Sequence, residues 1–383
     1  MTARPGTTLR LHAAGDIGIV GRLADGLSER PPDFPFEAVR PRLAEADVVF
    51  GNLEIPFSGG ARIVSHESPK LETPEAAAPR LAVAGFHVLS LANNHVMDFG
   101  PAGLERTLAL LAEHGICTVG AGANLAESRR PVVLERHGIR VGFLAYCVPF
   151  AGSAGPDRPG AAPLEIAHVR EDVAALRPRV DAVVVSVHFG MMYLEHPTPE
   201  DVDLAHAIVD AGADLVLGHH PHVLQGIETT PRGAIAYSLG EFVFDPRAGN
   251  YYARVARETR RRSIIFRADL GRDGAQVLPP LPTRAGDDLR PRPLDGEEAA
   301  RALAALEELS RALHDPAMRR GFWEYAGRQL FAYEISGLWD EIRRGELRHF
   351  FSRLPRLRPR HLKLVLGYVR SALSGSGRTA DSP

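Results

Sequence analysis

Short, continuous apolar runs of strand length recur along the first 245 residues of this 383-residue chain, and they constrain its fold more than any other feature. Uninterrupted runs, unlike runs that alternate with polar residues, are typical of strands buried on both faces. Most of them end at glycine, asparagine or a polar cluster. The seven runs are LRLHAAGD (9–16), ADVVFGN (46–52), FHVLSLANN (86–94), VGFLAYC (141–147), DAVVVSVHFG (181–190), ADLVLGHH (213–220) and AIAYSLGEF (234–242).

Helical patterns lie between these runs. Residues 100–116 begin with Gly-Pro and end at a glycine, and residues 199–213 begin with acidic residues after a proline and also end at a glycine. Proline at the start and glycine at the end are ordinary helix boundaries. Strands that alternate with helices of this length predict an α/β domain, which we place at residues 7–282. Its last elements are a predicted strand, turn and strand over 266–282.

The composition changes after residue 282. A connector rich in proline and charge leads to an Ala/Leu-rich amphipathic helix at 297–313, so we predict a helical extension over 283–373 and a disordered tail over 374–383. From Glu341 to the end, ten Arg or Lys stand against three Asp or Glu. This basic segment either packs on its own domain or on a second subunit, or it lies on an anionic membrane surface.

The totals exclude some classes of protein. An apolar content of 45% and a charged content of 24% are typical of a soluble globular domain, and a net charge of -2 argues against a nucleic-acid binder. Cys117 and Cys147 form no CxxC pattern, which argues against a disulfide framework or a thiolate metal site. With no signal peptide and no apolar run of about 18 residues, the sequence predicts a cytoplasmic protein; it leaves the oligomeric state open.

Polar clusters follow five of the apolar runs. Ligands of open α/β sheets bind outside the carboxyl ends of the strands, so these clusters are expected to converge on one place. Each residue alone has an ordinary structural alternative, such as capping a turn, but five clusters together favour a site. They are Asp16; Asn52 with Glu54; Asn93, Asn94 and His95; His188; and His219, His220 and His222.

Imidazole, carboxylate and amide groups are the ligands of divalent transition metals, and the set suits one or two ions of Mn, Fe or Zn. Two ions about 4 Å apart activate a water and stabilise both the entering and the leaving oxygen. A histidine beside the ions that is not itself a ligand can protonate a leaving group. The sequence therefore predicts a site for one or two divalent metal ions that is able to support such chemistry.

Several motifs resemble those of a known family. They are GDIG (15–18), FGNLE (50–54), SLANNHVMDFG (90–100), VSVHFG (185–190), GADLVLGHHPHVLQGIE (212–228) and YSLGEFVFD (237–245). In this order they resemble the CapA, or poly-gamma-glutamate capsule-synthesis, family, which is similar to the calcineurin-like metallophosphoesterases. The resemblance covers about residues 9 to 245. It implies a four-layer αββα sandwich.

Carried over residue by residue, the resemblance implies a metal site beside a catalytic histidine. Asp16 matches the superfamily's first metal-binding aspartate, and Asn52 and Glu54 fall in the second motif, where Glu54 is preferred because it brings charge. His95 matches the general acid, and Asp98 either orients it or caps the next helix. The implied ligands are Asp16, Asn52, Glu54, Asn94, His188, His220 and His222, while His219, Glu241 and Lys70 are assigned to the surroundings of the site or to substrate contact.

The chain also departs from the family pattern. The superfamily's Asp-x-His motif ends here in Gly18, so one expected imidazole ligand is absent. Its absence argues against a complete two-metal centre. Met192 stands where the family usually has a glutamate, and Glu241 stands where it usually has an asparagine. We interpret these exchanges as a shift of substrate preference away from the family norm.

The resemblance implies a metal-dependent hydrolase or transferase that directs activated water at a phosphoester or a gamma-glutamyl amide in capsule metabolism. Two alternatives remain. One is a specialised enzyme of a small-molecule or peptide pathway. The other is a non-catalytic, membrane-peripheral partner of a polymer synthase, docking through its basic C-terminal segment. The gamma-glutamyl substrate rests on analogy alone.

Overall fold

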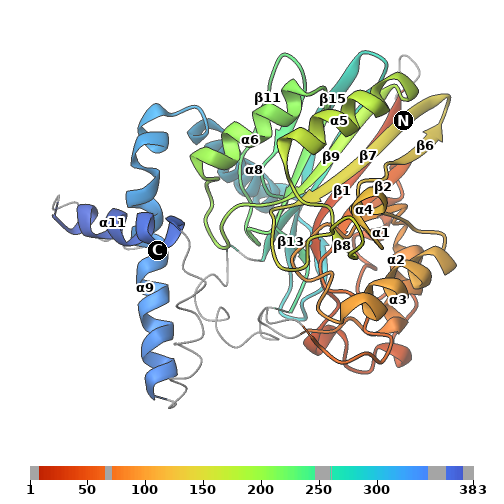
Figure 1. The fold of residues 1–383 in the computed structure, drawn as a ribbon, viewed down its shortest axis with the longest axis horizontal. Coiled ribbons are helices and arrows are strands. Elements are labelled where there is room, and N and C mark those ends of the chain that lie inside the picture. Colours follow the sequence, from red (N-terminus) through yellow and green to blue (C-terminus); the bar gives the residue numbers. More distant parts are fainter. Residues whose placement is uncertain (1–7, 65–70, 246–258, 260, 344–358, 374–383) are drawn as a thin grey trace. The chain divides into compact units, whose positions relative to one another are not determined.

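The structure is a computed structural model that describes residues 8–64, 71–245, 259, 261–343 and 359–373. The chain forms two compact units, residues 1–311 and 312–383 (Figure 1). The first unit contains every element that corresponds to the α/β domain expected from the sequence.

Among the described residues of the first unit, eight strands form one sheet, here called sheet one. Its order is β16-β15-β14-β1-β2-β3-β4, with β13 also paired to β1. Strands β1 to β4 and β13 are parallel, and β14 to β16 are antiparallel. The strands are β1 (Leu9–Ile17), β2 (Val48–Leu53), β3 (Val88–Ser90), β4 (Cys117–Val119), β13 (Glu241–Val243), β14 (Arg262–Gly271), β15 (Gly274–Ala285) and β16 (Pro291–Pro293).

A second sheet, sheet two, has the order β11-β12-β10-β9-β7-β6 over the described part of the chain. Its central strands β12, β10, β9 and β7 are parallel. Its members are β6 (Val132–Arg136), β7 (Ile139–Cys147), β9 (Ala182–His188), β10 (Leu215–His219), β11 (Ile227–Thr229) and β12 (Ala234–Ala236). A separate short pair joins β5 (Ala121–Gly122) to β8 (Gly160–Ala161).

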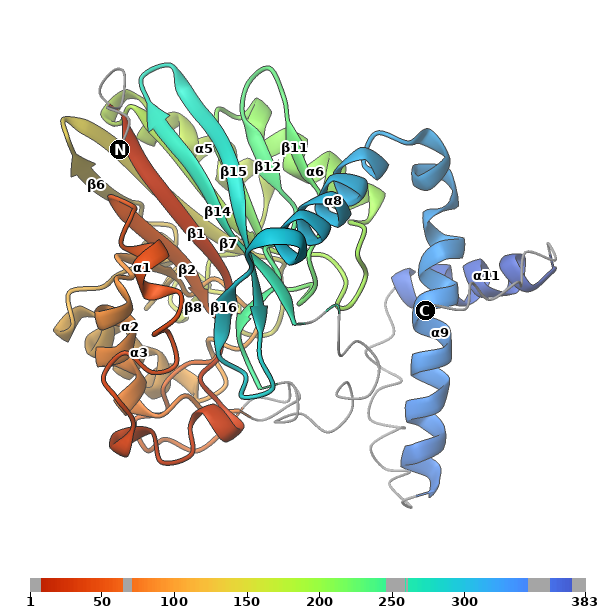
Figure 2. The same cartoon turned by 180° about the vertical axis from the view of Figure 1, so that it is seen from behind.

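Helices cover both outer faces. Helices α5 and α6 lie on the outer face of sheet two, and α8 lies on the opposite side of the unit (Figures 1 and 2). Buried leucines of α2 and α3 join the core beside sheet one. The helices are α1 (Arg40–Leu43), α2 (Ala78–Ala84), α3 (Gly100–Glu113), α4 (Leu125–Ser128), α5 (Ile166–Leu176), α6 (Pro199–Asp210) and α8 (Gly296–Ala312), with 3-10 turns at Gly21–Leu23, Leu27–Glu29, Glu75–Ala77 and Arg177–Arg179.

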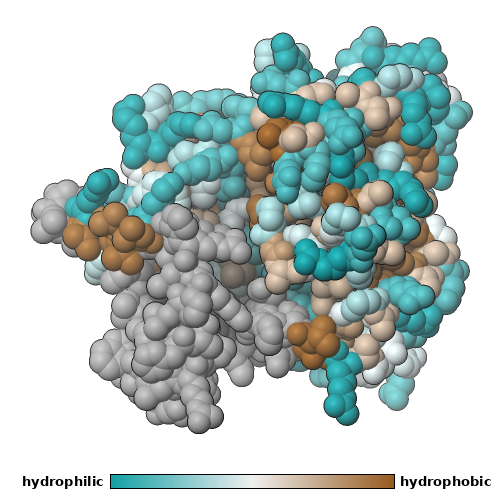
Figure 3. Space-filling view, viewed as in Figure 1, coloured by the Kyte–Doolittle hydropathy of each residue, from teal (hydrophilic) through white to brown (hydrophobic). Residues whose placement is uncertain are grey.

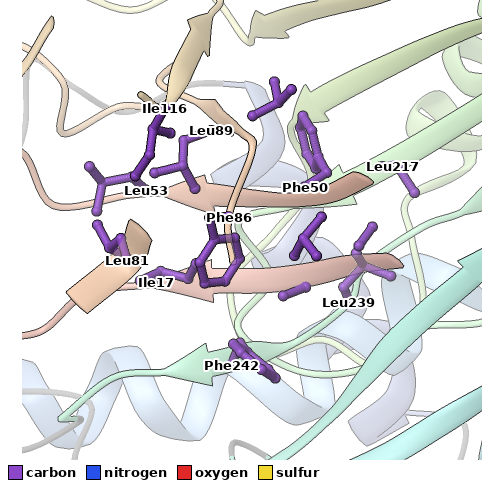
Figure 4. Packing of buried hydrophobic residues seen from close by; sticks show 14 of the residues in the cluster. Ile17, Phe50, Leu53, Leu81, Phe86, Leu89, Ile116, Leu217, Leu239 and Phe242 are labelled. Atoms are coloured by element: carbon purple, nitrogen blue, oxygen red, sulfur yellow. The ribbon is translucent and has the colours of Figure 1, made fainter. Parts of the chain in front are cut away.

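The two sheets pack face to face around one apolar core. The ring of Phe50 on β2 stacks on the ring of Phe143 on β7, with centroids 5.9 Å apart. Figure 4 shows Phe50 of sheet one and Leu217 of sheet two in the same cluster. Burying each such side chain stabilises the fold by about 1.5–3 kcal/mol. Two facing sheets between helical layers confirm the predicted four-layer αββα sandwich.

Most of the predicted elements are confirmed. The first six apolar runs correspond to β1, β2, β3, β7, β9 and β10, and the predicted hairpin is formed by β14 and β15. The predicted helices correspond to α3, α6 and α8. Thr198 and Asp201 form a capping box at the start of α6, where each side chain accepts from the other residue's backbone N–H.

One predicted strand is wrong. The run over 234–242 is not a single strand, because residues 234–236 form β12 in sheet two and residues 241–243 form β13 in sheet one. The chain crosses between the sheets at residues 237–240, where Gly240 has a φ of 74°. Left-handed backbone of this kind suits glycine, which has no Cβ to clash. The crossover carries the chain from one sheet to the other directly beside β1.

The first unit extends past residue 282, which falls inside β15. Strand β16 pairs with β15, and Leu306 of α8 is buried in the core cluster, so both elements belong to the sandwich. The predicted tail, residues 374–383, lies outside the described residues.

The second unit contains helices α9 (Pro316–Arg343) and α11 (Pro359–Leu373). They pack closely at two glycines: a Cβ on Gly367 would lie 1.8 Å from the carbonyl oxygen of Trp323. In the part of the chain that the structure describes, no helix combines the length and the apolar character needed to cross a membrane.

Candidate metal centre

The predicted site residues lie at one end of both sheets. On sheet one, Asp16 pairs in register with Asn52 of β2 on one side and with Glu241 of β13 on the other. On sheet two, His188 ends β9 and pairs in register with His219, which ends β10. Because β1 and β2 are parallel, as are β9 and β10, the carboxyl ends of each pair lie at one edge of its sheet, and Glu241 joins Asp16 from the amino end of β13.

Asp16 is the fully buried centre of this arrangement. Its Oδ1 accepts a hydrogen bond from Asn52 Nδ2 at 2.9 Å and lies 3.3 Å from His219 Nδ1. Its Oδ2 lies 3.3 Å from His222 Nδ1. Burial favours the protonated carboxyl, but the imidazoles of His219 and His222 outweigh it and hold the pKa of Asp16 well below its usual range. Asp16 is therefore an anionic oxygen donor at neutral pH.

Two groups of donor atoms within the described residues are close enough to hold an ion. In each group the atoms lie within 4.8 Å of one another: Glu54, His188 and His220 form one, and Asp16, Glu54 and His222 form the other. Glu54 belongs to both. Its Oε1 lies 3.3 Å from His222 Nε2. The geometry thus offers two adjacent positions that share one carboxylate.

Several buried polar atoms here have no hydrogen-bond partner in the described part of the chain. They are Glu54 Oε2 and Nε2 of His219, together with Nδ1 of His219 and Nδ1 of His222, which lie 3.3 Å from Asp16 oxygens but not in hydrogen-bond geometry. Buried polar groups of native proteins nearly always have a partner, so these atoms call for one. A divalent cation bound by mixed nitrogen and oxygen donors would supply it, and the residues present fit such an ion.

His188 links the two sheets across the site. Its Nε2 lies 2.9 Å from Asn94 Oδ1 and 3.1 Å from His220 Nδ1. Burial, and next the charge of His220, keep the pKa of His188 well below its usual value, so the ring is neutral and has a lone pair to offer.

The two histidines that follow β10 have an unusual backbone conformation. His220 and His222 have φ angles of 98° and 58°, in the left-handed region that residues other than glycine rarely adopt. Each such conformation costs on the order of 1–3 kcal/mol and clusters at functional sites. The backbone N–H of His220 also donates to Asp16 Oδ2 at 3.3 Å. In this conformation a ring nitrogen of His220 lies near Glu54 and His188, and a ring nitrogen of His222 lies near Asp16 and Glu54.

His95 and Asp98 form a buried pair beside these donor groups. Their Nδ1 and Oδ2 atoms are 2.8 Å apart. Burial disfavours the imidazolium, but the bond to Asp98 and its charge outweigh this and raise the pKa of His95. Asp98 does not cap the next helix, because Phe99 is the N-cap residue of α3 and no side chain bonds there. The sequence left two roles open for Asp98, and its contact with Nδ1 fits the one in which Asp98 orients the ring of His95.

The remaining predicted residues have simpler positions. Asn52 Oδ1 accepts from Asn93 Nδ2 at 3.4 Å, and Asn93 also donates to the carbonyl oxygen of Leu53 at 2.8 Å, which anchors the loop that carries His95. Glu241 Oε1 lies 3.4 Å from His222 Nδ1. Lys70 lies outside the described residues.

Two aromatic residues of the site were not predicted. The rings of Tyr193 and Phe244 lie 6.0 Å and 5.7 Å from the ring of His222. Phe244 falls within the motif YSLGEFVFD, but nothing in the sequence pairs it with His222. Tyr193 has a φ of 65°, a left-handed conformation that no sequence pattern predicts.

Comparisons with known proteins show the family of this chain. The family described as "Bacterial capsule synthesis protein PGA_cap" matches residues 10–246, more than half of the chain. The capsule biosynthesis protein CapA of Bacillus anthracis is 34% identical over 251 residues, which cover 63% of this chain and 61% of that protein. The PGA biosynthesis protein CapA of Bacillus subtilis (strain 168) is 34% identical over 236 residues, which cover 60% and 62%. The chain spans about three fifths of the length of these relatives.

Among solved structures, the chain is similar to a novel phosphatase from Mycoplasma pneumoniae. The two share 12% sequence identity with a TM-score of 0.46, over 77% of this chain and 96% of that one.

Proposed function

The chain belongs to the family of bacterial capsule synthesis proteins, and we propose that it is a metal-dependent hydrolase or transferase of poly-gamma-glutamate capsule metabolism. Its substrate would contain a phosphoester or a gamma-glutamyl amide. The observation that carries the proposal is the pair of donor groups that share Glu54, with His95 and Asp98 beside them.

The metal centre would be held by residues from both sheets. Ions bound there would lower the pKa of water and offset negative charge that develops on the substrate oxygen. Sheet one would contribute carboxylates, which neutralise the ions, and sheet two would contribute imidazoles. The residues are Asp16, Glu54, Asn94, His188, His220 and His222, of which Asn94 precedes α3.

His95 would act as the proton donor to the leaving group. Asp98 holds Nδ1 at 2.8 Å, so Nε2 is the ring nitrogen that can transfer a proton. The raised pKa of His95 keeps the ring protonated closer to neutral pH. General acids placed in this way typically contribute about 10²- to 10⁴-fold to a rate.

The test is an assay of metal-loaded protein against phosphoesters and gamma-glutamyl peptides, with the variant His95→Gln. His206→Gln is a matched control, because His206 Nε2 also lies near a carboxylate, Glu228 Oε2 at 2.9 Å, but on α6 and outside the site. We expect turnover of one substrate class, reduced at least ~100-fold in His95→Gln and unchanged in His206→Gln. Absence of turnover with both classes would refute the enzymatic proposal.

A second candidate function is a membrane-peripheral partner of a polymer synthase, and helix α11 favours it. Four apolar side chains with helical spacing are exposed on this helix: Leu362, Val365, Leu366 and Val369. In Figure 3, seen from the same side as Figure 1, exposed apolar side chains gather where α11 lies. Residues 359–373 contain no Asp or Glu, and Lys363 and Arg370 are exposed near the stripe. An apolar stripe flanked by cations is typical of helices that lie on anionic membranes.

Co-sedimentation with vesicles tests this second candidate. We expect the full chain to bind vesicles of phosphatidylcholine with phosphatidylglycerol and the double variant Leu362→Gln, Leu366→Gln to lose binding. Val64→Gln replaces an exposed valine of the first unit and serves as the control. Equal binding by all three proteins would exclude α11 as the membrane contact.

A further inference from the structure

Gly18 contributes no donor to the site, and the structure shows why. A Cβ at this position would lie 2.6 Å from the ring of Phe244. The backbone N–H of Gly18 donates to the carbonyl oxygen of Val243 at 2.7 Å, which fixes the strand against β13. The space of a side chain two residues after Asp16 is therefore filled by Phe244.

The neighbouring strand places a carboxylate beside Asp16 instead. Glu241 begins β13, is 5% exposed and pairs in register with Asp16. The backbone N–H of Asp16 donates to the carbonyl oxygen of Gly240 at 2.9 Å. A Cβ on Gly15 would lie 1.9 Å from that same oxygen, so β1 and β13 meet at a distance that only glycine allows.

Three carboxylates surround a single imidazole at this point. Asp16 Oδ2 and Glu241 Oε1 lie 3.3 Å and 3.4 Å from His222 Nδ1, and Glu54 Oε1 lies 3.3 Å from Nε2 of the same ring. Glu241 approaches the group formed by Asp16, Glu54 and His222 from the side of β13. One imidazole offsets at most one of three negative charges, whereas a divalent cation offsets two more.

We propose that Glu241 is a ligand of the ion at the position of Asp16, Glu54 and His222, supplying from β13 the donor that Gly18 lacks. An oxygen donor in place of an imidazole favours ions that prefer carboxylates, so this position would prefer Zn²⁺ over Mn²⁺ less strongly than a histidine-rich one. The inference rests on the proposed metal centre and goes beyond it by naming the ligand and its selectivity.

Titration of metal-free protein with Mn²⁺ and Zn²⁺ by calorimetry tests this assignment without any assay of activity. We expect the parent protein to bind two Mn²⁺ ions. In Glu241→Gln one of the two sites should lose at least ~10-fold in Mn²⁺ affinity, with a smaller loss for Zn²⁺. Glu54→Gln should weaken both sites, because Glu54 belongs to both groups.

Two further variants serve as controls for this titration. Glu228→Gln removes a buried carboxylate that bonds Tyr237 outside the site, and it should bind both ions as the parent does. Glu241→Asp keeps the charge on a shorter side chain and should give an intermediate Mn²⁺ affinity. This variant tests the assignment even if Glu241→Gln does not fold.

The outcomes separate the two proposals. If Glu241→Gln and Glu241→Asp bind two Mn²⁺ ions with the parent's affinities, Glu241 is not a ligand, while the metal centre stands. If the parent itself binds no ion, both the metal centre and the role of Glu241 are overturned.

Discussion

Replacing Asp98 with asparagine tests the buried pair that it forms with His95. The substitution keeps the shape of the side chain and removes its charge. His95 and Asp98 are 6% and 1% exposed, so solvent screens their 2.8 Å contact little. The raised pKa of His95 means that the pair stabilises the folded state most when the imidazole is protonated.

The size of the effect follows from the two forms of the bond. A hydrogen bond between charged groups contributes about 1.5–3 kcal/mol, and a neutral one contributes about 0.5–1.5 kcal/mol. The difference is about 1.4 kcal/mol. This stabilisation is fully present below the unfolded pKa of about 6.5 and is lost as the pH rises through the higher folded pKa. Asp98→Asn should therefore lower the free energy of unfolding by about 1.4 kcal/mol more at pH 5 than at pH 9.

The assay is denaturant unfolding of metal-free parent and variant at both pH values, beside an NMR titration of the His95 ring. We expect the pKa of His95 to be lower in the variant than in the parent, because the charge of Asp98 that raises it is removed. Glu228→Gln, which removes a carboxylate outside the site that contacts His206 and Tyr237, is the control for the loss of a buried carboxylate. An equal loss of stability at pH 5 and pH 9 would refute the assigned charge on His95.

Three further predictions concern the site and its support. Burial lowers the pKa of His222, but Glu54 and Asp16 outweigh this effect and raise it, so a proton on His222 competes with the ion. Calorimetry should therefore show that Mn²⁺ affinity rises by up to about tenfold per pH unit between pH 6 and 8. Burial, and next the charge of Arg267, lower the pKa of His12 to about 4, so keeping His12 unprotonated in the folded state costs more free energy as the pH falls below 6.5. In denaturant unfolding, His12→Leu should therefore stabilise the protein by about 2 kcal/mol more at pH 5 than at pH 7.5. Gly15→Ala should lower the free energy of unfolding by about 1–3 kcal/mol and weaken Mn²⁺ binding, because its Cβ would meet the carbonyl oxygen of Gly240.

Much of the fold was predictable because its signals are local. Each central parallel strand is buried on both faces, so it appears in the sequence as a continuous apolar run, and proline and glycine mark the ends of the helices between them. The short strands β4 and β6 and helix α5 were not predicted. Residues 117–119 are too few to show a period, and β6 is largely exposed at the edge of sheet two.

The crossover between the sheets was not predictable from periodicity. Residues 234–242 form one apolar run, and the switch of sheet depends on packing: Gly218 leaves no room for a Cβ beside the carbonyl oxygen of Tyr237, and Gly240 turns the chain toward β1. The position of Glu241 beside Asp16 follows from that switch, so its contact with His222 could be found only in the structure.

The candidate site itself was predictable to the extent that its residues end apolar runs. Asp16, Asn52, His188 and His219 lie at strand ends that converge by topology alone. The left-handed backbone of His220 and His222 and the rings around His222 depend on tertiary contacts that no local pattern encodes.

The metal content of the purified protein tests the central claim most directly. Elemental analysis of the parent should find one or two equivalents of Mn, Fe or Zn, and the double variant His220→Ala, His222→Ala should lose them, because each histidine belongs to one of the two donor groups. Thermal unfolding should show that the variant remains folded. A parent that contains no metal and takes none up on incubation, or a folded double variant with the parent's metal content, would contradict the account.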